Sequence, residues 1–141
     1  MKFLFRFASV LKVRRYQKRK EKQKLGMLLN QKRMIKQQIR DLKKKCQHAF
    51  NQPQKQSVLA NRQYYAHKHS QHERLTQLKQ QHRVLGIKVE EQRGKLSKAV
   101  KKMRMMEKLK EREKRAFVER VEHMEQLQQN EIAIQRYNSD Y

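Results

Sequence analysis

The stretch LTQLKQQHRVLGIKVEEQRGKLSKAVKKMRMMEKLKEREKRAF, residues 75–117, decides the fold of this chain. Its apolar residues recur in alternating steps of three and four, and the phase does not slip before the chain ends. We call these mostly apolar positions the second seam; they are Leu75, Leu78, His82, Leu85, Val89, Gln92, Leu96, Ala99, Met103, Met106, Lys110, Glu113, Phe117, Arg120, Met124, Leu127, Glu131 and Ile134. A spacing of about 3.5 residues keeps one stripe of a helix against a partner helix, which is typical of a coiled coil.

A first seam with the same spacing runs through the opening third of the chain. Its positions are Leu4, Phe7, Leu11, Arg14, Lys18, Glu21, Leu25, Leu28, Lys32, Ile35, Ile39, Leu42, Cys46 and Ala49. The sequence Gln52-Pro53-Gln54 then interrupts the helical pattern, because proline lacks the helical hydrogen bond and disfavours helix in the residue before it. Two seams separated by one proline predict an antiparallel pair of long helices.

The expected fold is therefore all-α, with two long helices forming an antiparallel coiled-coil hairpin. The first arm covers residues 1–50, with its helix from about Phe3, and the second arm covers residues 72–137. Residues 138–141 form a frayed tail. The tip, residues 51–71, is irregular or short-helical: Ser57 can cap a helix, but extending the second seam backwards meets only polar and aromatic residues. Those positions are Gln71, Lys68, Tyr64 and Asn61.

Charges on the seams suggest a register. In an antiparallel pair, the residue numbers of facing layers sum to a constant that changes only in steps of seven. A sum of 131 turns the polar positions Lys18, Glu21, Lys110 and Glu113 into two layers of opposite charge, Lys18 with Glu113 and Glu21 with Lys110. Sums of 124 and 138 bring like charges together, which is unfavourable. We therefore expect a sum of 131, with Leu4 facing Leu127 and the bend near Tyr65.

The composition excludes several classes of protein. Only 36% of the 141 residues are hydrophobic, 35% are charged, and there is no Trp, which is typical of a long helix and argues against sheets. The formal net charge of +24 predicts an acidic partner: nucleic acid, an anionic membrane or an acidic protein cavity. The last segment is acidic instead, since Glu119, Glu122, Glu125, Glu131 and Asp140 outnumber Arg120 and Arg136.

Few residues offer chemistry. Cys46 is the only cysteine, so a reducing compartment fits best, and its seam position indicates core packing. His67, His69 and His72 invite a metal site, but only two of them share a helical face, so a solvated polar tip is the expectation. The chain has no glycine-rich phosphate loop, nucleophile motif or paired carboxylates. We expect no enzyme activity, no cofactor and no metal.

The opening residues allow an alternative. No stretch approaches the roughly 20 apolar residues that a membrane span needs. Met1–Lys20 has a basic start and no acid, which is compatible with an organellar presequence or a membrane-surface helix. The seam positions Leu4, Phe7 and Leu11 continue into the downstream seam, which favours the coiled coil.

Aromatic residues mark both ends of the hairpin. Tyr64 and Tyr65 are adjacent on a tip without a seam, so both cannot be buried between two helices. Exposed aromatic side chains are common anchors at protein interfaces. Phe3 and Phe5 lie beside the seam residue Phe7 and give the opposite end an aromatic collar.

These features resemble the FliJ family, the small coiled-coil component of the flagellar type III export apparatus. The resemblance rests on the aromatic opening FLFRFASVLKVR at residues 3–14, on Ser57-Val58 and Arg62-Gln63-Tyr64 after a polar break, and on a Glu-rich end. It spans nearly the whole chain. A phenylalanine that follows the tip tyrosine in the family is missing, and His67 and His69 stand in that region.

The resemblance implies a non-enzymatic stalk. FliJ-like proteins insert the terminal end into the pore of the hexameric export ATPase and activate it. The opposite tip reaches the cytoplasmic domain of the export gate, and chaperone recycling is associated with the family. Carried onto this chain, the ATPase-ring contacts would be Phe3, Phe5, Phe7, Leu11, Met124 and Leu127, and the gate contacts Tyr64 and Tyr65. The implied location is the cytoplasm, at the inner membrane beneath the flagellar basal body; a related injection apparatus and a basic nucleic-acid-binding coiled coil remain alternatives.

Overall fold

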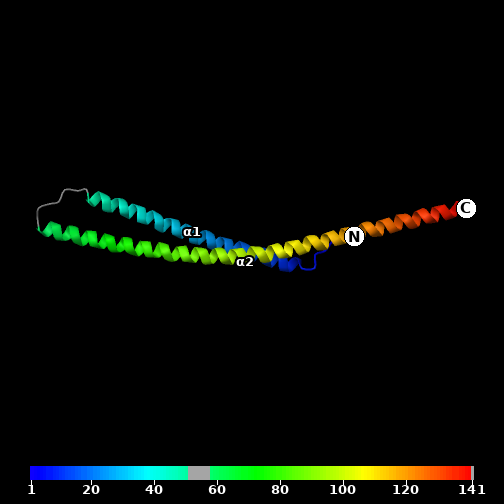
Figure 1. Ribbon diagram of the computed structural model, residues 1–141, viewed down its shortest axis with the longest axis horizontal. Helices are drawn as coiled ribbons and strands as arrows, with labels where there is room; N and C mark the ends of the chain where they lie inside the picture. Colours follow the sequence, from blue (N-terminus) through cyan, green and yellow to red (C-terminus); the bar gives the residue numbers. More distant parts are fainter. Residues whose placement is uncertain (51–57, 141) are drawn as a thin grey trace. The chain divides into compact units, whose positions relative to one another are not determined.

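The protein consists of two long helices in a computed structural model that describes residues 1–50 and 58–140 (Figure 1). Helix α1 spans Ala8–Phe50, and helix α2 spans Val58–Ser139. The described residues contain no strand. The helices pack against each other, so the all-α prediction is confirmed. The break at Pro53 and the cap at Ser57 lie outside the described residues.

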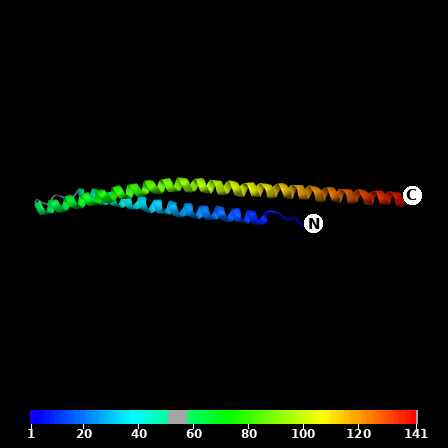
Figure 2. The same cartoon turned by 90° about the horizontal axis from the view of Figure 1, so that it is seen from below.

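Contacts divide the chain into two units. Unit 1 contains Met1–Arg19 and Lys98–Tyr141, and unit 2 is Lys20–Ser97. Within unit 2, a segment of α1 and a segment of α2 lie side by side in both views (Figures 1 and 2). Within unit 1, the start of α1 lies against the middle of α2. Each unit is thus a pair of helical segments whose core is a single layer.

The burial pattern confirms the seams over most of their length. In α1, every seam position from Leu11 to Cys46 is buried or half-buried, and in α2 the same holds from Leu75 to Phe117. The most buried side chains all belong to the seams: Leu11, Leu78, Val89, Gln92 and Met103. A repeat of about 3.5 residues therefore identifies the packed face without any knowledge of the partner helix.

One buried layer is polar. Gln92 is only 6% exposed, and its amide donates to the backbone oxygen of Glu21 at 3.1 Å and to the Glu21 carboxylate. Both acceptors come from α1, so the amide joins the two helices directly. A buried polar side chain is tolerated in such a core because its hydrogen bonds are made.

The register differs from the predicted one. In unit 2, Glu21 lies against Gln92 and Cys46 lies against Gln71, so the residue numbers of contacting pairs sum to 113 and 117 instead of 131. Glu21 therefore has Gln92 as its partner, and the predicted pairing with Lys110 is wrong. The Cys46–Gln71 sum is 14 lower than 131, which corresponds to two heptads, so the phase of the seams is kept while the helices are displaced. The Glu21–Gln92 pair is offset by a further four residues, about one helical turn.

Unit 1 shows the same displacement. Phe3, which precedes α1, packs on Phe117, and Arg15 pairs with Glu107. Arg15 and Glu107 each directly follow a seam position, and for such flanking pairs a seam sum of 131 corresponds to a sum of 136. Their observed sum of 122 is therefore again lower by 14. In the part of the chain that the structure describes, Lys18 and Glu113 form no salt bridge. The predicted Lys18–Glu113 layer is wrong as well.

The physical reason lies at the tip. Residues 58–71 belong to α2, and three of the four positions of the backward extension of the seam, Asn61, Tyr64 and Gln71, are half-buried, whereas Lys68 is exposed. Half-buried side chains therefore continue back to Ala60, and Tyr65 lies within α2 rather than at a bend. Partly exposed ion pairs contribute only about 0–1 kcal/mol, so two charged layers could not outweigh the additional helix pairing.

The ends of the helices differ from expectation too. Helix α1 begins at Ala8 rather than near Phe3, and its first turns include hydrogen bonds from the Ala8 amide to the Phe5 oxygen and from the Leu11 amide to the Phe7 oxygen. Leu4 precedes the helix and is 81% exposed, so it does not face Leu127. At the other end, α2 continues to Ser139, two residues beyond the expected boundary.

Candidate interaction sites at the two ends

Unit 1 carries a cluster of phenylalanines where the chain enters α1. The rings of Phe3 and Phe117 are 5.6 Å apart between centroids, and those of Phe5 and Phe7 are 6.1 Å apart. The Arg6 guanidinium lies 5.4 Å from the centroid of the Phe7 ring. These separations are typical of aromatic pairs and of a cation–π contact. We call Phe3, Phe5, Phe7 and Phe117 the terminal aromatic cluster.

The cluster exists because residues 1–7 precede the helix. Their backbone is not constrained to a helical path, so Phe3 can reach α2 while Phe5 and Phe7 pack on each other. All four rings are half-buried, which leaves part of each available to a partner. Phe117, the α2 member, was predicted as a seam position but not as part of this site; the sequence feature that could have indicated it is an aromatic side chain on the seam.

The other residues predicted to contact the ATPase ring differ in how exposed they are. Leu11 is 3% exposed and belongs to the core between the helices, so it cannot serve as a surface contact without opening that core. Met124 and Leu127 are 47% and 52% exposed. They lie about 10 and 15 Å beyond Phe117 along α2, at 1.5 Å per residue. The structure therefore does not bring them to the terminal aromatic cluster.

The end of α2 is exposed to solvent. Every residue from 122 to 140 is exposed, and in both views this part of α2 has no neighbouring segment (Figures 1 and 2). We call residues 122–140 the C-terminal extension. It presents five large exposed apolar side chains: Met124, Leu127, Ile132, Ile134 and Tyr137. It also has four acids against one arginine, in a protein of net charge +24.

Three of these apolar residues, Met124, Leu127 and Ile134, continue the second seam. The seam therefore extends beyond the part of α2 that α1 covers. Apolar side chains that follow a coiled-coil repeat and lie in water are costly, and such a stripe marks an interaction surface. These seam positions are visible in the sequence, but only the observed register shows that α1 does not cover them.

In unit 2, the two tip tyrosines differ in burial. Their rings are 5.6 Å apart at an interplanar angle of 75°. Tyr64 is half-buried on the α1-facing side of α2, whereas Tyr65 is 59% exposed. Of the two predicted tip contacts, Tyr65 is the more accessible to a partner.

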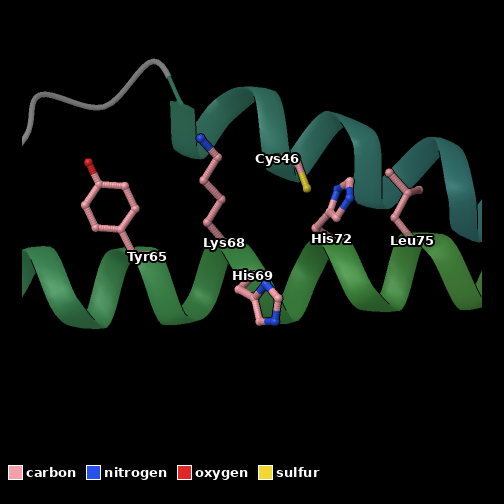
Figure 3. A pocket seen from close by; sticks show the side chains of 6 residues that line it. All are labelled: Cys46, Tyr65, Lys68, His69, His72 and Leu75. Atoms are coloured by element: carbon pink, nitrogen blue, oxygen red, sulfur yellow. The ribbon is translucent and has the colours of Figure 1, made fainter.

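A hollow of about 500 Å³ lies beside these rings in unit 2 (Figure 3). Its lining residues are Cys46, Tyr65, Lys68, His69, His72 and Leu75. In Figure 3, Cys46 points from α1 toward α2, and His72 points from α2 toward α1. The hollow therefore spans the gap between the helices near the tip.

Cys46, which lines this hollow, belongs to a short chain of hydrogen bonds. The Cys46 thiol donates to Gln71 Oε1 at 3.4 Å, and Gln71 Nε2 lies 3.0 Å from His67 Nε2. Because the amide nitrogen can only donate, the His67 nitrogen that faces it accepts. Cys46 is thus a half-buried seam residue, as expected.

The three histidines do not converge. His67 contacts Gln71, His69 lies 3.1 Å from the Glu73 carboxylate, and His72 points toward α1. Among the described residues, no group of three or more histidine, cysteine or acidic side chains could hold a metal ion.

A family model described as "Flagellar FliJ protein" matches residues 1–140. The chain belongs to the FliJ family. The FliJ family is a non-catalytic component of the flagellar export apparatus, so the resemblance seen in the sequence is confirmed. No curated protein and no solved structure matches the chain. In this FliJ-family chain, no described helix is long and apolar enough to cross a membrane.

Proposed function

We propose that this protein is the stalk of the flagellar type III export apparatus, which inserts its terminal end into the pore of the hexameric export ATPase and activates it. The observation that supports this most is the C-terminal extension, whose apolar seam positions continue beyond the last contact with α1. Membership of the FliJ family supplies the apparatus in which the partner is found. A ring of subunits around the extension would shield these side chains from water.

The terminal aromatic cluster supports the extension mechanically in this proposal. The Phe3–Phe117 contact holds the residues before α1 against α2, close to the point where the paired part of unit 1 ends. The C-terminal extension would then continue from a segment of α2 that this contact holds in place. Phe3, Phe5 and Phe7 are contacts for the mouth of the pore, while Met124 and Leu127 are contacts farther inside.

The charge of the extension adds a requirement on the partner. Between residues 122 and 140 there are four acids and one arginine, so the net charge is −3 with neutral histidine. The part of the pore that surrounds it should therefore be basic or neutral. This differs from the acidic cavity that the net charge of the whole chain suggests.

The opposite end contacts the cytoplasmic domain of the export gate in this proposal, with Tyr65 as the exposed anchor and Tyr64 supporting it. Export chaperones are a further class of partner that the family resemblance implies. The protein would act in the cytoplasm, at the inner membrane beneath the flagellar basal body, and would be held there by the apparatus.

The test is the ATP hydrolysis rate of the cognate export ATPase, titrated with this protein at physiological salt. We expect stimulation that saturates near one chain per hexamer. Changing Met124 and Leu127 to aspartate should abolish it. The matched control changes Gln126 and Gln129 to aspartate, which adds the same charge to a different face of the extension.

Since all four positions are exposed, neither variant should lose helix content by circular dichroism. Equal loss of stimulation in both variants would point to charge alone and would contradict the apolar contact. Absence of stimulation at every ratio, together with tight salt-sensitive DNA binding, would favour the nucleic-acid-binding alternative.

A further inference from the structure

Helix α1 carries a second regular row of side chains outside the seam. Arg33, Lys36, Arg40 and Lys43 follow one another in steps of three, four and three residues, and all four are exposed. Residues at these steps share one face of a helix. The row is about 15 Å long, at 1.5 Å per residue, and lies entirely in unit 2. We call it the basic ridge.

The ridge lies along one flank of the helix pair. Lys36 and Lys43 each directly follow a seam residue of α1, Ile35 and Leu42. The opposite flank is marked by a separate hollow, whose lining includes Gln38, Asp41, Lys45 and Arg74. The one acid in this part of α1, Asp41, is therefore on the other flank, where it accepts a hydrogen bond from Gln37 at 3.0 Å.

On the corresponding flank in unit 1, a cation of α1 is paired with an acid of α2. Arg15 also directly follows a seam residue, and it pairs with Glu107 of α2 at 3.5 Å. The residue numbers of that pair sum to 122. In unit 2, Lys43 and Lys79 also directly follow seam residues, and their numbers sum to 122 as well, which is the flanking sum that corresponds to the seam sum of 117 for Cys46 and Gln71. The flank that is neutralised in unit 1 therefore carries two lysines at the equivalent level of unit 2.

No acid compensates the ridge. In the part of the chain that the structure describes, none of its four side chains makes a salt bridge or a side-chain hydrogen bond. On α2, Lys79 and Arg83 are also exposed, and neither makes such a bond to any residue that the structure describes. Like charges placed together on a surface destabilise the folded pair slightly. An arrangement of this kind is favourable when an external anion covers it.

We propose that the basic ridge binds an anionic lipid surface. Its four cations form a straight row, and mobile lipid headgroups can gather under a row of any spacing. A DNA duplex instead presents phosphates along two strands separated by grooves about 6 and 12 Å wide, so a straight row meets them only where a strand crosses. The ridge contains no apolar side chain, so the protein adsorbs to the headgroups without inserting.

Nothing in this inference depends on the ATPase, because the ridge is in unit 2 and the proposed ring contacts are in unit 1. Each Lys or Arg near an anionic membrane contributes about fivefold in affinity. Four ridge cations should therefore contribute more than about 100-fold. The attraction should fall steeply with salt, because exposed charges are screened over about 8–10 Å at physiological ionic strength.

The experiment is co-sedimentation of the full chain with vesicles of phosphatidylglycerol mixed with phosphatidylcholine, and with vesicles of phosphatidylcholine alone. The ridge variant changes Arg33, Lys36, Arg40 and Lys43 to glutamine. The control variant changes four exposed cations of the other flank, Lys45, Arg74, Lys88 and Lys95, to glutamine. Both lose the same charge, and glutamine is a good helix former, so circular dichroism should show intact helices.

We expect the wild type to sediment only with anionic vesicles, the ridge variant to lose more than about 100-fold in affinity, and the control to lose much less. Equal losses would show that net charge alone is responsible and would overturn the proposal. Failure of the wild type to bind anionic vesicles at physiological salt would do so too. If DNA displaces the protein from vesicles and its binding needs the same four side chains, the ridge is a nucleic-acid surface.

The ATPase contact of the C-terminal extension and the lipid contact of the basic ridge can be tested independently of each other. In solution without vesicles, the ridge variant should stimulate the export ATPase as the wild type does. The Met124 and Leu127 variant should bind vesicles normally. Loss of both activities in one variant would indicate damage to the fold.

Discussion

A disulfide between the helices would test the observed register directly. Cys46 of α1 lies against Gln71 of α2, with 3.4 Å between Sγ and Oε1. In the Gln71→Cys variant, the two thiols should oxidise to an intramolecular disulfide. A register sum of 131 would instead place Cys46 opposite Leu85, so Leu85→Cys is the matched control. The two variants distinguish registers that differ by two heptads.

The expected gain in stability can be calculated from the loop that the bond closes. Cys46 and Gln71 are 25 residues apart. Restricting a loop of that size in the unfolded chain corresponds to about 3.5 kcal/mol at 25 °C in the chain-entropy model. With a urea dependence of about 1–3 kcal/mol per molar for a small protein, the midpoint of unfolding should rise by about 1–3 M.

The assay compares urea unfolding of oxidised and reduced protein, followed by circular dichroism, after mass spectrometry has confirmed a monomer with an internal bond. The gain should disappear when reductant is added. Rapid internal oxidation of the Leu85→Cys variant, with none in Gln71→Cys, would refute the register. Covalent dimers in both would show that the chains pair with each other and not within one hairpin.

Three further predictions concern stability. Val89→Ala should cost about 1–3 kcal/mol in urea unfolding because Val89 is 1% exposed, whereas Val84→Ala, at a position that is 39% exposed, should stay within about 0.5 kcal/mol of wild type; similar values for both would contradict the seam assignment. A double-mutant cycle on Phe3 and Phe117, each changed to alanine, should give a coupling energy of about 0.5–1.5 kcal/mol, and a coupling of zero would mean that the rings do not touch. Gln92→Ala should cost about 1–3 kcal/mol, since it leaves the half-buried Glu21 groups without their donor, and an unchanged unfolding midpoint would exclude that hydrogen bond.

The candidate site was only partly predictable from the sequence. Tyr65 was singled out as an exposed aromatic residue of the tip, and it is exposed in the structure. Met124, Leu127 and Leu11 were assigned as contacts through the family resemblance, and only Met124 and Leu127 are exposed. Leu11 is instead a core residue, because α1 begins at Ala8 and its first seam position is immediately covered by α2.

The register decides where the free end of α2 begins. With the predicted pairing of Leu4 and Leu127, the first arm would cover most of the second seam. The observed register is displaced by two heptads, so the N-terminal end of α1 lies earlier along α2 and residues 122–140 remain exposed. The surface proposed for the ATPase pore is thus a direct consequence of the register.

The sequence by itself determined the all-α class, the two seams and the residues that face the partner helix. These are local properties, since a repeat of about 3.5 residues positions side chains on one face whatever lies opposite. Only the tertiary structure decided the register, the Gln92–Glu21 layer and the length of the free C-terminal extension. Registers that differ by a heptad keep the same helix faces in contact. Their free energies differ only by the small contributions of partly exposed contacts. The choice among them depends on the whole length of the pairing, including the turn, and no single charged layer dictates it.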